Sequence, residues 1–383
     1  MSLRLGDFGG RVFGLAAVAN FAHSMAFHSY LHLPGFLEGL GADEFAIGNI
    51  MALAFLVAIL VRPLIGRWMD EWGRRPVFLA GGVISIGTAL GYQGIDALGA
   101  PLLGLRVTHG IAVGALFSVL FTIAADVVPE ERRAQGLALF GVSGMLPLAL
   151  GGLMGDWLLT DGEYDRLFWA IAGCAVMGLL VSLPIEETRT QGLGGRRGFL
   201  QVATAPPLRP LWVVGIAFAF ALAAFFIFLK TWVLELGEGS LGEVFAWYAG
   251  VAIALRVFLG HLPERVGLKR VLFPALLVTT AGLGTLGFAD SSFALNVAGV
   301  LCGAGHGFAF PIISALVVQR ADPNQRGSAV AMFTALFDLG ALVAGPSLGY
   351  VARDAGYPTM FMLAAATCLA ATLLFAFIDR KEA

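Results

Sequence analysis

The segment from Gly66 to Pro76 reads GRWMDEWGRRP and lies between two long apolar stretches, residues 44–65 and 76–95. A helix needs about 20 mostly apolar residues to cross the hydrocarbon core of a bilayer, and both stretches come near that length. The segment is therefore predicted to be a short polar loop between two membrane-spanning helices.

The residue types in this loop suit a tight connection. Gly66 permits close approach of neighbouring helices, and Gly73 permits a sharp reversal of the chain. Asp70 is placed to accept hydrogen bonds from an exposed helix N-terminus or from an arginine. A purely topological role for the arginines would explain the positive charge, but it would not explain the glycines and the acid.

The same loop recurs in the second half of the chain. Gly260, Glu264, Gly267 and Lys269 each follow Gly66, Asp70, Gly73 and Arg75 by 194 residues (260 − 66). The same shift carries Pro129 to Pro323 and Gly151 to Gly345. One constant offset over separate loops and a helix predicts two parallel repeats, as in several transporter folds.

The composition agrees with a membrane protein. Of 383 residues, 58% are hydrophobic and 13% are charged, whereas soluble domains carry roughly 25% charged residues, and the mean hydropathy is +0.83. The net charge of −2 gives no basic surface of the kind that binds nucleic acid. An ordinary soluble domain is excluded, and we expect no nucleic-acid partner.

Twelve apolar stretches are long enough to span the membrane, which predicts an all-α protein with two six-helix bundles. We predict a first bundle at residues 1–185, a cytoplasmic linker at 186–209 and a second bundle at 210–383. The stretches cover residues 12–33, 44–65, 76–95, 101–125, 135–157, 167–184, 211–233, 243–262, 271–289, 293–318, 328–350 and 359–378.

The short loops differ in charge on the two sides of this arrangement. Lysine and arginine gather on one side, with Arg166 and Arg353 as the exceptions, while acids such as Asp43 lie on the other. The positive side is predicted to be the cytoplasm, so both termini are cytoplasmic.

With its loop, its repeat and its twelve spans, the chain resembles the major facilitator superfamily, and in particular the twelve-helix drug and metabolite efflux branch. In that family the loop acid clamps the start of helix eleven, which begins here at Arg326. The resemblance implies that Gly66, Asp70, Gly73, Arg74, Arg75 and Arg326 form a gating motif. It also implies a secondary transporter in a cell inner membrane that works by alternating access.

Helix five bears on the direction of transport. Its glycines and Pro147 are similar to the pattern of the family's antiporters, but the contiguous Gly-Pro of that pattern occurs only in the second half, as Gly345-Pro346. Packing by small residues is the alternative explanation. We expect proton-coupled efflux of a small organic solute. Uptake or facilitated diffusion of an organic anion or metabolite is the alternative.

The resemblance places helices one, four, seven and ten around a central cavity, and their polar residues are the site candidates. An intramembrane arginine is costly and needs a polar surrounding, although Arg106 could instead reach the aqueous surface. Histidine can change its charge near neutral pH, so the histidines or Asp338 could carry the proton, while interhelical hydrogen bonding is the alternative role for each histidine. The candidates on these four helices are Asn20, His23, Ser24, His28, Arg106, His109, Lys230 and His306, and Asp338, midway along helix eleven, is a further candidate.

Several other classes lack sequence support. No Gly-rich, Lys-Ser/Thr nucleotide-binding motif occurs, so energy should come from a gradient. No paired nucleophile and base indicates an enzyme, and we expect no cofactor. His23, His28 and His32 with Met25 could suggest a metal path, but no carboxylate or cysteine joins them, so we expect no metal. We expect a monomer in the lipid bilayer with a small-molecule substrate and protons as partners. A non-transporting protein on the same scaffold stays an open alternative.

Overall fold

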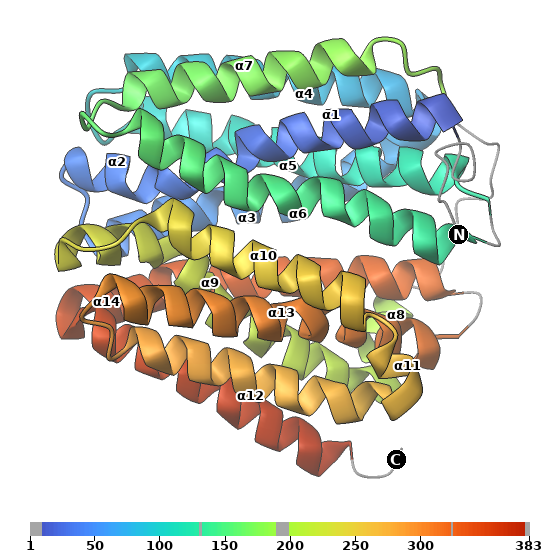
Figure 1. The fold of residues 1–383 in the computed structure, drawn as a ribbon. Helices are drawn as coiled ribbons and strands as arrows, with labels where there is room; N and C mark the ends of the chain where they lie inside the picture. The colour runs from blue at the N-terminus through green and yellow to red at the C-terminus, as the bar shows by residue number, and fades with distance from the viewer. Residues whose placement is uncertain (1–9, 130–131, 189–198, 323–324, 380–383) are drawn as a thin grey trace. The chain divides into compact units, whose positions relative to one another are not determined.

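A computed structural model describes residues 10–129, 132–188, 199–322 and 325–379, and these are helical almost throughout, with no strand among them (Figure 1). Long apolar segments favour helices in a bilayer because each backbone N–H is then bonded within its own segment. The chain is thus an all-α membrane protein, as predicted.

Contacts divide the chain into two units, and each is described by itself. The first comprises the described parts of Met1–Phe36 and Leu56–Gly194, and the second those of Leu37–Phe55 and Gly195–Ala383. Helix α3 contributes to both. The predicted boundaries at residues 185 and 210 stay a prediction.

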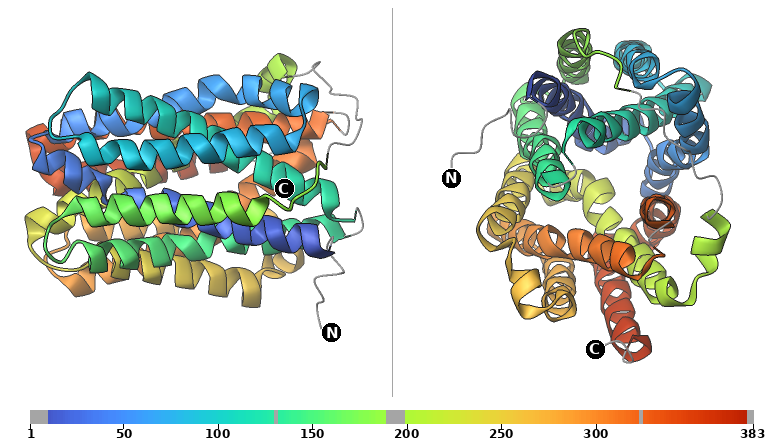
Figure 2. Two further views of the ribbon diagram at one scale, coloured as in Figure 1. Left: turned by 90° about the horizontal axis from the view of Figure 1, so that it is seen from above. Right: turned by 90° about the vertical axis from the view of Figure 1, so that its right-hand side faces the viewer.

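The first unit contains α1, the turn η2, most of α3, and α4 to α7. Helix α1 packs on α6 and α7, and α4 packs on α5 and α7 (Figures 1 and 2). The bounds are Gly10–Ser29 for α1, Tyr30–His32 for η2, Glu44–Glu71 for α3, Arg74–Gly91 for α4, Tyr92–Gly94 for η3, Ala100–Val127 for α5, Arg133–Leu158 for α6 and Tyr164–Ser182 for α7.

The second unit begins with the last part of α2, from Leu37, and the first part of α3, and it continues from α8 to α14. Helix α9 packs along α14, and α13 packs on both α10 and α12. The bounds are Leu33–Gly39 for α2, Phe199–Thr204 for α8, Pro206–Leu208 for η5, Arg209–Leu236 for α9, Leu241–Leu259 for α10, Leu262–Val266 for α11, Leu268–Leu286 for α12, Ser292–Arg320 for α13 and Arg326–Ile378 for α14.

Helix α14 holds the last two predicted spans. Its backbone leaves the helical region at Gly356, where φ is 81°, a conformation that glycine adopts readily. With α14 counted as two, the described residues contain twelve long helices. Length and hydropathy alone select nine candidate spans among them, because α14 counts once and the less apolar α1 and α12 fall short.

Glycines allow helix backbones to meet within the second unit. A Cβ added at Gly48 of α3 would clash with the carbonyl group of Gly345 on α14, and a Cβ at Gly349 would clash with that of Glu44. Small residues are the usual means of close helix packing in membranes. Gly66 differs from these, since a Cβ there would meet nothing within 4 Å, so close packing does not explain this glycine.

Candidate functional site

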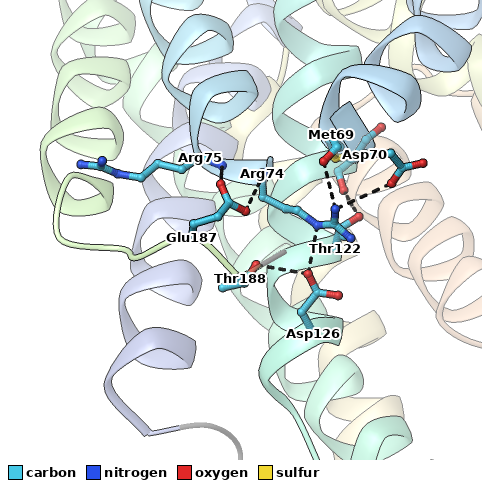
Figure 3. A network of polar contacts seen from close by, with 9 residues as sticks. Met69, Asp70, Arg74, Arg75, Thr122, Asp126, Glu187 and Thr188 are labelled. Carbon is cyan, nitrogen blue, oxygen red and sulfur yellow. Dashed lines mark hydrogen bonds and ion pairs between the residues drawn. The ribbon is translucent and has the colours of Figure 1, made fainter. Parts of the chain in front are cut away.

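Arg74, the first residue of α4, points toward Asp126 of α5 (Figure 3). Arg74 donates from Nε to Asp126 Oδ2 at 3.1 Å and from Nη1 to the Met69 carbonyl at 3.0 Å. Its side chain is 11% exposed, and Asp70 lies 3.7 Å from it with 66% of its own side chain exposed. Asp70 thus forms an ion pair with an arginine of its own loop, at a distance longer than a hydrogen bond. Its predicted role at the start of helix eleven stays a prediction.

A carboxylate that was not predicted caps the next helix. Glu187 accepts hydrogen bonds from the backbone N–H groups of Arg74 and Arg75, at 2.8 and 3.1 Å (Figure 3). A negative charge stabilises a helix N-terminus because the first N–H groups there have no partner within the helix. Gly73, at φ 101°, makes the reversal before α4 as expected, and a Cβ there would clash with Glu187.

The second unit has a similar arrangement after its own last helix. Arg320 at the end of α13 binds both oxygens of Asp379, at 2.9 and 2.7 Å. Lys269 of the repeated loop lies 2.9 Å from Asp379 Oδ2. Partial burial raises the pKa of Asp379, but the hydrogen bonds and charges of Arg320 and Lys269 outweigh it and hold the pKa below its usual range.

These two carboxylates were missed because they fall outside the repeat. Glu187 and Asp379 lie 192 residues apart (379 − 187), and the 194-residue shift pairs neither with an acid. The acids after the sixth and last spans were the available signal.

Three of the predicted residues on α1 lie together against α6. Asn20 donates from Nδ2 to Ser143 Oγ at 2.9 Å, and His28 Nε2 lies 3.2 Å from the Gly144 carbonyl oxygen. A carbonyl only accepts, so His28 carries its proton on Nε2. A Cβ added at Gly144 would come within 3.7 Å of Ser24. The structure thus brings Asn20, Ser24 and His28 into one interface between helices.

His23 lies on another side of α1. It is 6% exposed, and its ring packs edge-on to Phe78 of α4, with 5.4 Å between ring centres. A Cβ added at Gly178 of α7 would come within 2.7 Å of the imidazole. Within the described part of the chain, neither ring nitrogen has a hydrogen-bond partner. His23 is therefore an interior residue of the first unit.

Arg106 and His109 form a buried pair on α5. Arg106 donates from Nη1 to His109 Nδ1 at 3.1 Å, and the two residues are 2% and 6% exposed. The Tyr30 ring lies 4.3 Å from the His109 ring, centre to centre. Such burial disfavours the alternative in which Arg106 reaches the aqueous surface. Since Nδ1 accepts a hydrogen bond from Arg106, neutral His109 carries its own proton on Nε2.

His306 lies among aromatic rings in the second unit. The Tyr248 hydroxyl is hydrogen-bonded to His306 Nδ1, and the rings of Phe218 and Phe310 lie 5.8 and 5.9 Å from the imidazole. Arg256 donates to the neighbouring Gly307 carbonyl at 3.1 Å. His306 is half-buried, and its imidazole has a fixed partner in Tyr248.

Lys230 and Asp338 complete the predicted set. Lys230 is 9% exposed on α9. Partial burial and the charges of Glu44 and Glu235 raise the pKa of Glu38, and the positive charge of Lys230 partly offsets this increase. Asp338 is half-buried on α14. No group of three metal-ligating side chains occurs among the described residues.

The sequence pattern of the Major Facilitator Superfamily matches residues 13–242 and 234–383. The chain belongs to the Major Facilitator Superfamily. It is a multi-pass membrane protein whose function is solute transport.

Named relatives agree with this assignment. The chain is 26% identical over 355 residues to a protein described as "Uncharacterized MFS-type transporter YhhS" from Escherichia coli (strain K12), covering 89% of this chain and 86% of the relative. Two solved structures share the transporter's fold. One is a POT family transporter in complex with 5-aminolevulinic acid, with a TM-score of 0.83, 13% identity and 96% of each chain covered. The other is the human organic anion transporter MFSD10, with a TM-score of 0.72, 20% identity and coverage of 95% and 99%.

Proposed function

We propose that this transporter is a proton-coupled secondary carrier that exports a small organic solute across the bacterial inner membrane, and that it is not an enzyme. The observation that carries the proposal is the buried Arg106–His109 pair in a largely apolar helix. An arginine at such a place costs roughly 2.5–3.5 kcal/mol on insertion scales, so it is retained for a purpose. A cation beside a titratable imidazole suits a solute with an anionic group.

The half-buried His306 supplies a second titratable group, in the other unit. Its Tyr248 partner fixes the ring, and its aromatic neighbours suit the apolar part of an organic solute. Export rather than uptake is favoured by the glycines and Pro147 of helix five, which are similar to the pattern of the family's antiporters. The enterobacterial relative favours an inner-membrane location.

Transport in proteoliposomes tests the coupling. Solutes are first selected by thermal shift, since a ligand that binds only the folded state raises apparent stability. His109→Gln and His306→Gln should each preserve folding and some binding, and the one that carries the proton should abolish the dependence of flux on a pH gradient. Asp338→Asn should matter less.

Opposite outcomes are equally clear. If Asp338→Asn alone removes coupling and both histidine variants transport normally, the histidines are packing residues and α14 carries the proton. If flux runs down the solute gradient and ignores pH in the unmodified protein, facilitated diffusion replaces proton-coupled export. Absence of flux for every binding solute would favour a non-transporting role.

A further inference from the structure

His32 occupies a bend at the end of the first span. Pro34 has no N–H group and cannot donate back to Tyr30. Leu33 donates to the Tyr30 carbonyl instead, and Tyr30–His32 forms a 3-10 turn. The turn directs His32 onto α6, where the side chain is fully buried.

Two oxygen acceptors face the two nitrogens of this imidazole. His32 Nε2 lies 3.0 Å from the Gly152 carbonyl oxygen, and Nδ1 lies 3.9 Å from Asp156 Oδ1. The carbonyl only accepts, so Nε2 carries a proton. Neutral His32 would then point the lone pair of Nδ1 at a carboxylate, whereas the imidazolium would offer an N–H to both oxygens.

Gly155 of α6 leaves the space that the His32 imidazole occupies. A Cβ added at Gly155 would clash with the His32 ring, so no larger residue could stand there without displacing the imidazole. Tyr30 lies in the same turn as His32, His28 lies one turn earlier on α1, and Asp156 lies near the end of α6, whereas Arg11, His23 and Arg133 lie further along these two helices. Asp156 is the charged group that His32 faces, and its side chain is 23% exposed, which leaves a route for protons.

His28 provides an internal comparison one turn earlier. It makes the same kind of bond to a carbonyl of α6, that of Gly144. Within the described ranges, however, no carboxylate lies within ion-pair distance of His28. The difference between the two histidines is therefore Asp156.

We propose that His32 and Asp156 form a proton-binding site of the first unit, in which the proton is held on His32 Nδ1 against the carboxylate. The role of this site in coupling rests on the function proposed above. The proton comes from water on one side of the membrane and returns to water on the other, so no further reactant is needed.

Proton binding is measured without transport, by nuclear magnetic resonance of the full chain in nanodiscs with nitrogen-15-labelled histidine. The His32 signal is identified by its loss in His32→Gln, and the His28 signal by its loss in His28→Gln. His32 should take its second proton at higher pH than His28. Asp156→Asn should lower the His32 midpoint by about one pH unit or more, leave that of His28 unchanged, and be rescued by Asp156→Glu.

An unchanged His32 midpoint in Asp156→Asn, or a His32 that stays neutral wherever the protein is folded, would overturn the site. In proteoliposomes, His32→Gln and Asp156→Asn should each uncouple flux from the pH gradient, and the matched control Asp156→Glu should stay coupled. Retained coupling in His32→Gln would overturn the coupling role. If the unmodified protein titrates as expected but its flux ignores pH, the proton site stands and the proposed function fails.

Discussion

Asp379 is the residue on which two cations of the second unit converge. Replacing it with asparagine removes the negative charge that both Arg320 and Lys269 contact at a largely buried position. Breaking such a pair costs about 3 kcal/mol. We expect Asp379→Asn to lower the thermal unfolding temperature at pH 7, measured on the purified protein in detergent.

The pH dependence of this effect follows from the lowered pKa of Asp379. The stabilising contribution is fully present above the usual carboxyl pKa of about 4 and is lost as pH falls through the lower folded value. The difference between the natural protein and Asp379→Asn should therefore shrink as the pH is lowered past 4. Asp354→Asn is the control. Asp354 pairs with Arg353, their side chains are 43% and 35% exposed, and exposed ion pairs contribute little to stability. Equal losses in both variants would contradict the assignment.

At the scale of elements, the crossing of α3 and α14 depends on glycine. We expect Gly48→Ala to push α3 away from the Gly345 backbone and to cost about 1–3 kcal/mol, as overpacking does. Gly66→Ala, on the same helix but in open space, should be neutral or slightly stabilising because alanine favours helix more than glycine.

Thermal unfolding compares these two variants. Cross-linking of cysteines placed at Phe45 and Tyr350, whose rings lie 6.4 Å apart, reports the spacing of the same two helices. The cross-link should form more slowly in Gly48→Ala than in Gly66→Ala. Identical rates and unfolding temperatures would show that the crossing tolerates a side chain.

At the scale of the whole molecule, the charge asymmetry predicts its orientation. Single cysteines in the loops at Gly73 and Gly267 should resist an impermeant reagent added outside intact cells, whereas one at Asp43 should react. The native Cys302 and Cys368 are buried and should stay silent. Reaction of the Gly73 loop from outside would reverse the assignment of every helix end.

The fold could be predicted from sequence because each membrane span is visible as a long apolar stretch and the repeat is visible as a constant offset of 194 residues. Gly73 and Gly267 indeed share positive φ values, 101° and 111°. The neighbours of the polar residues could not be predicted, because α1 carries polar side chains on several sides. Asn20 and His28 meet α6 whereas His23 meets α4 and α7, and His32 pairs with an acid 124 residues away (156 − 32).

The clustering of Leu37–Phe55 with the second unit matters for any attempt to make the transporter from two polypeptides. A cut in the linker would leave these residues on the first fragment. The second fragment, synthesised alone, would then expose the backbone at Gly345 and Gly349 that α3 normally covers. Transport in the cell should therefore require the two fragments to be synthesised together. A second fragment that begins with its own copy of α3 should be the better candidate for expression alone.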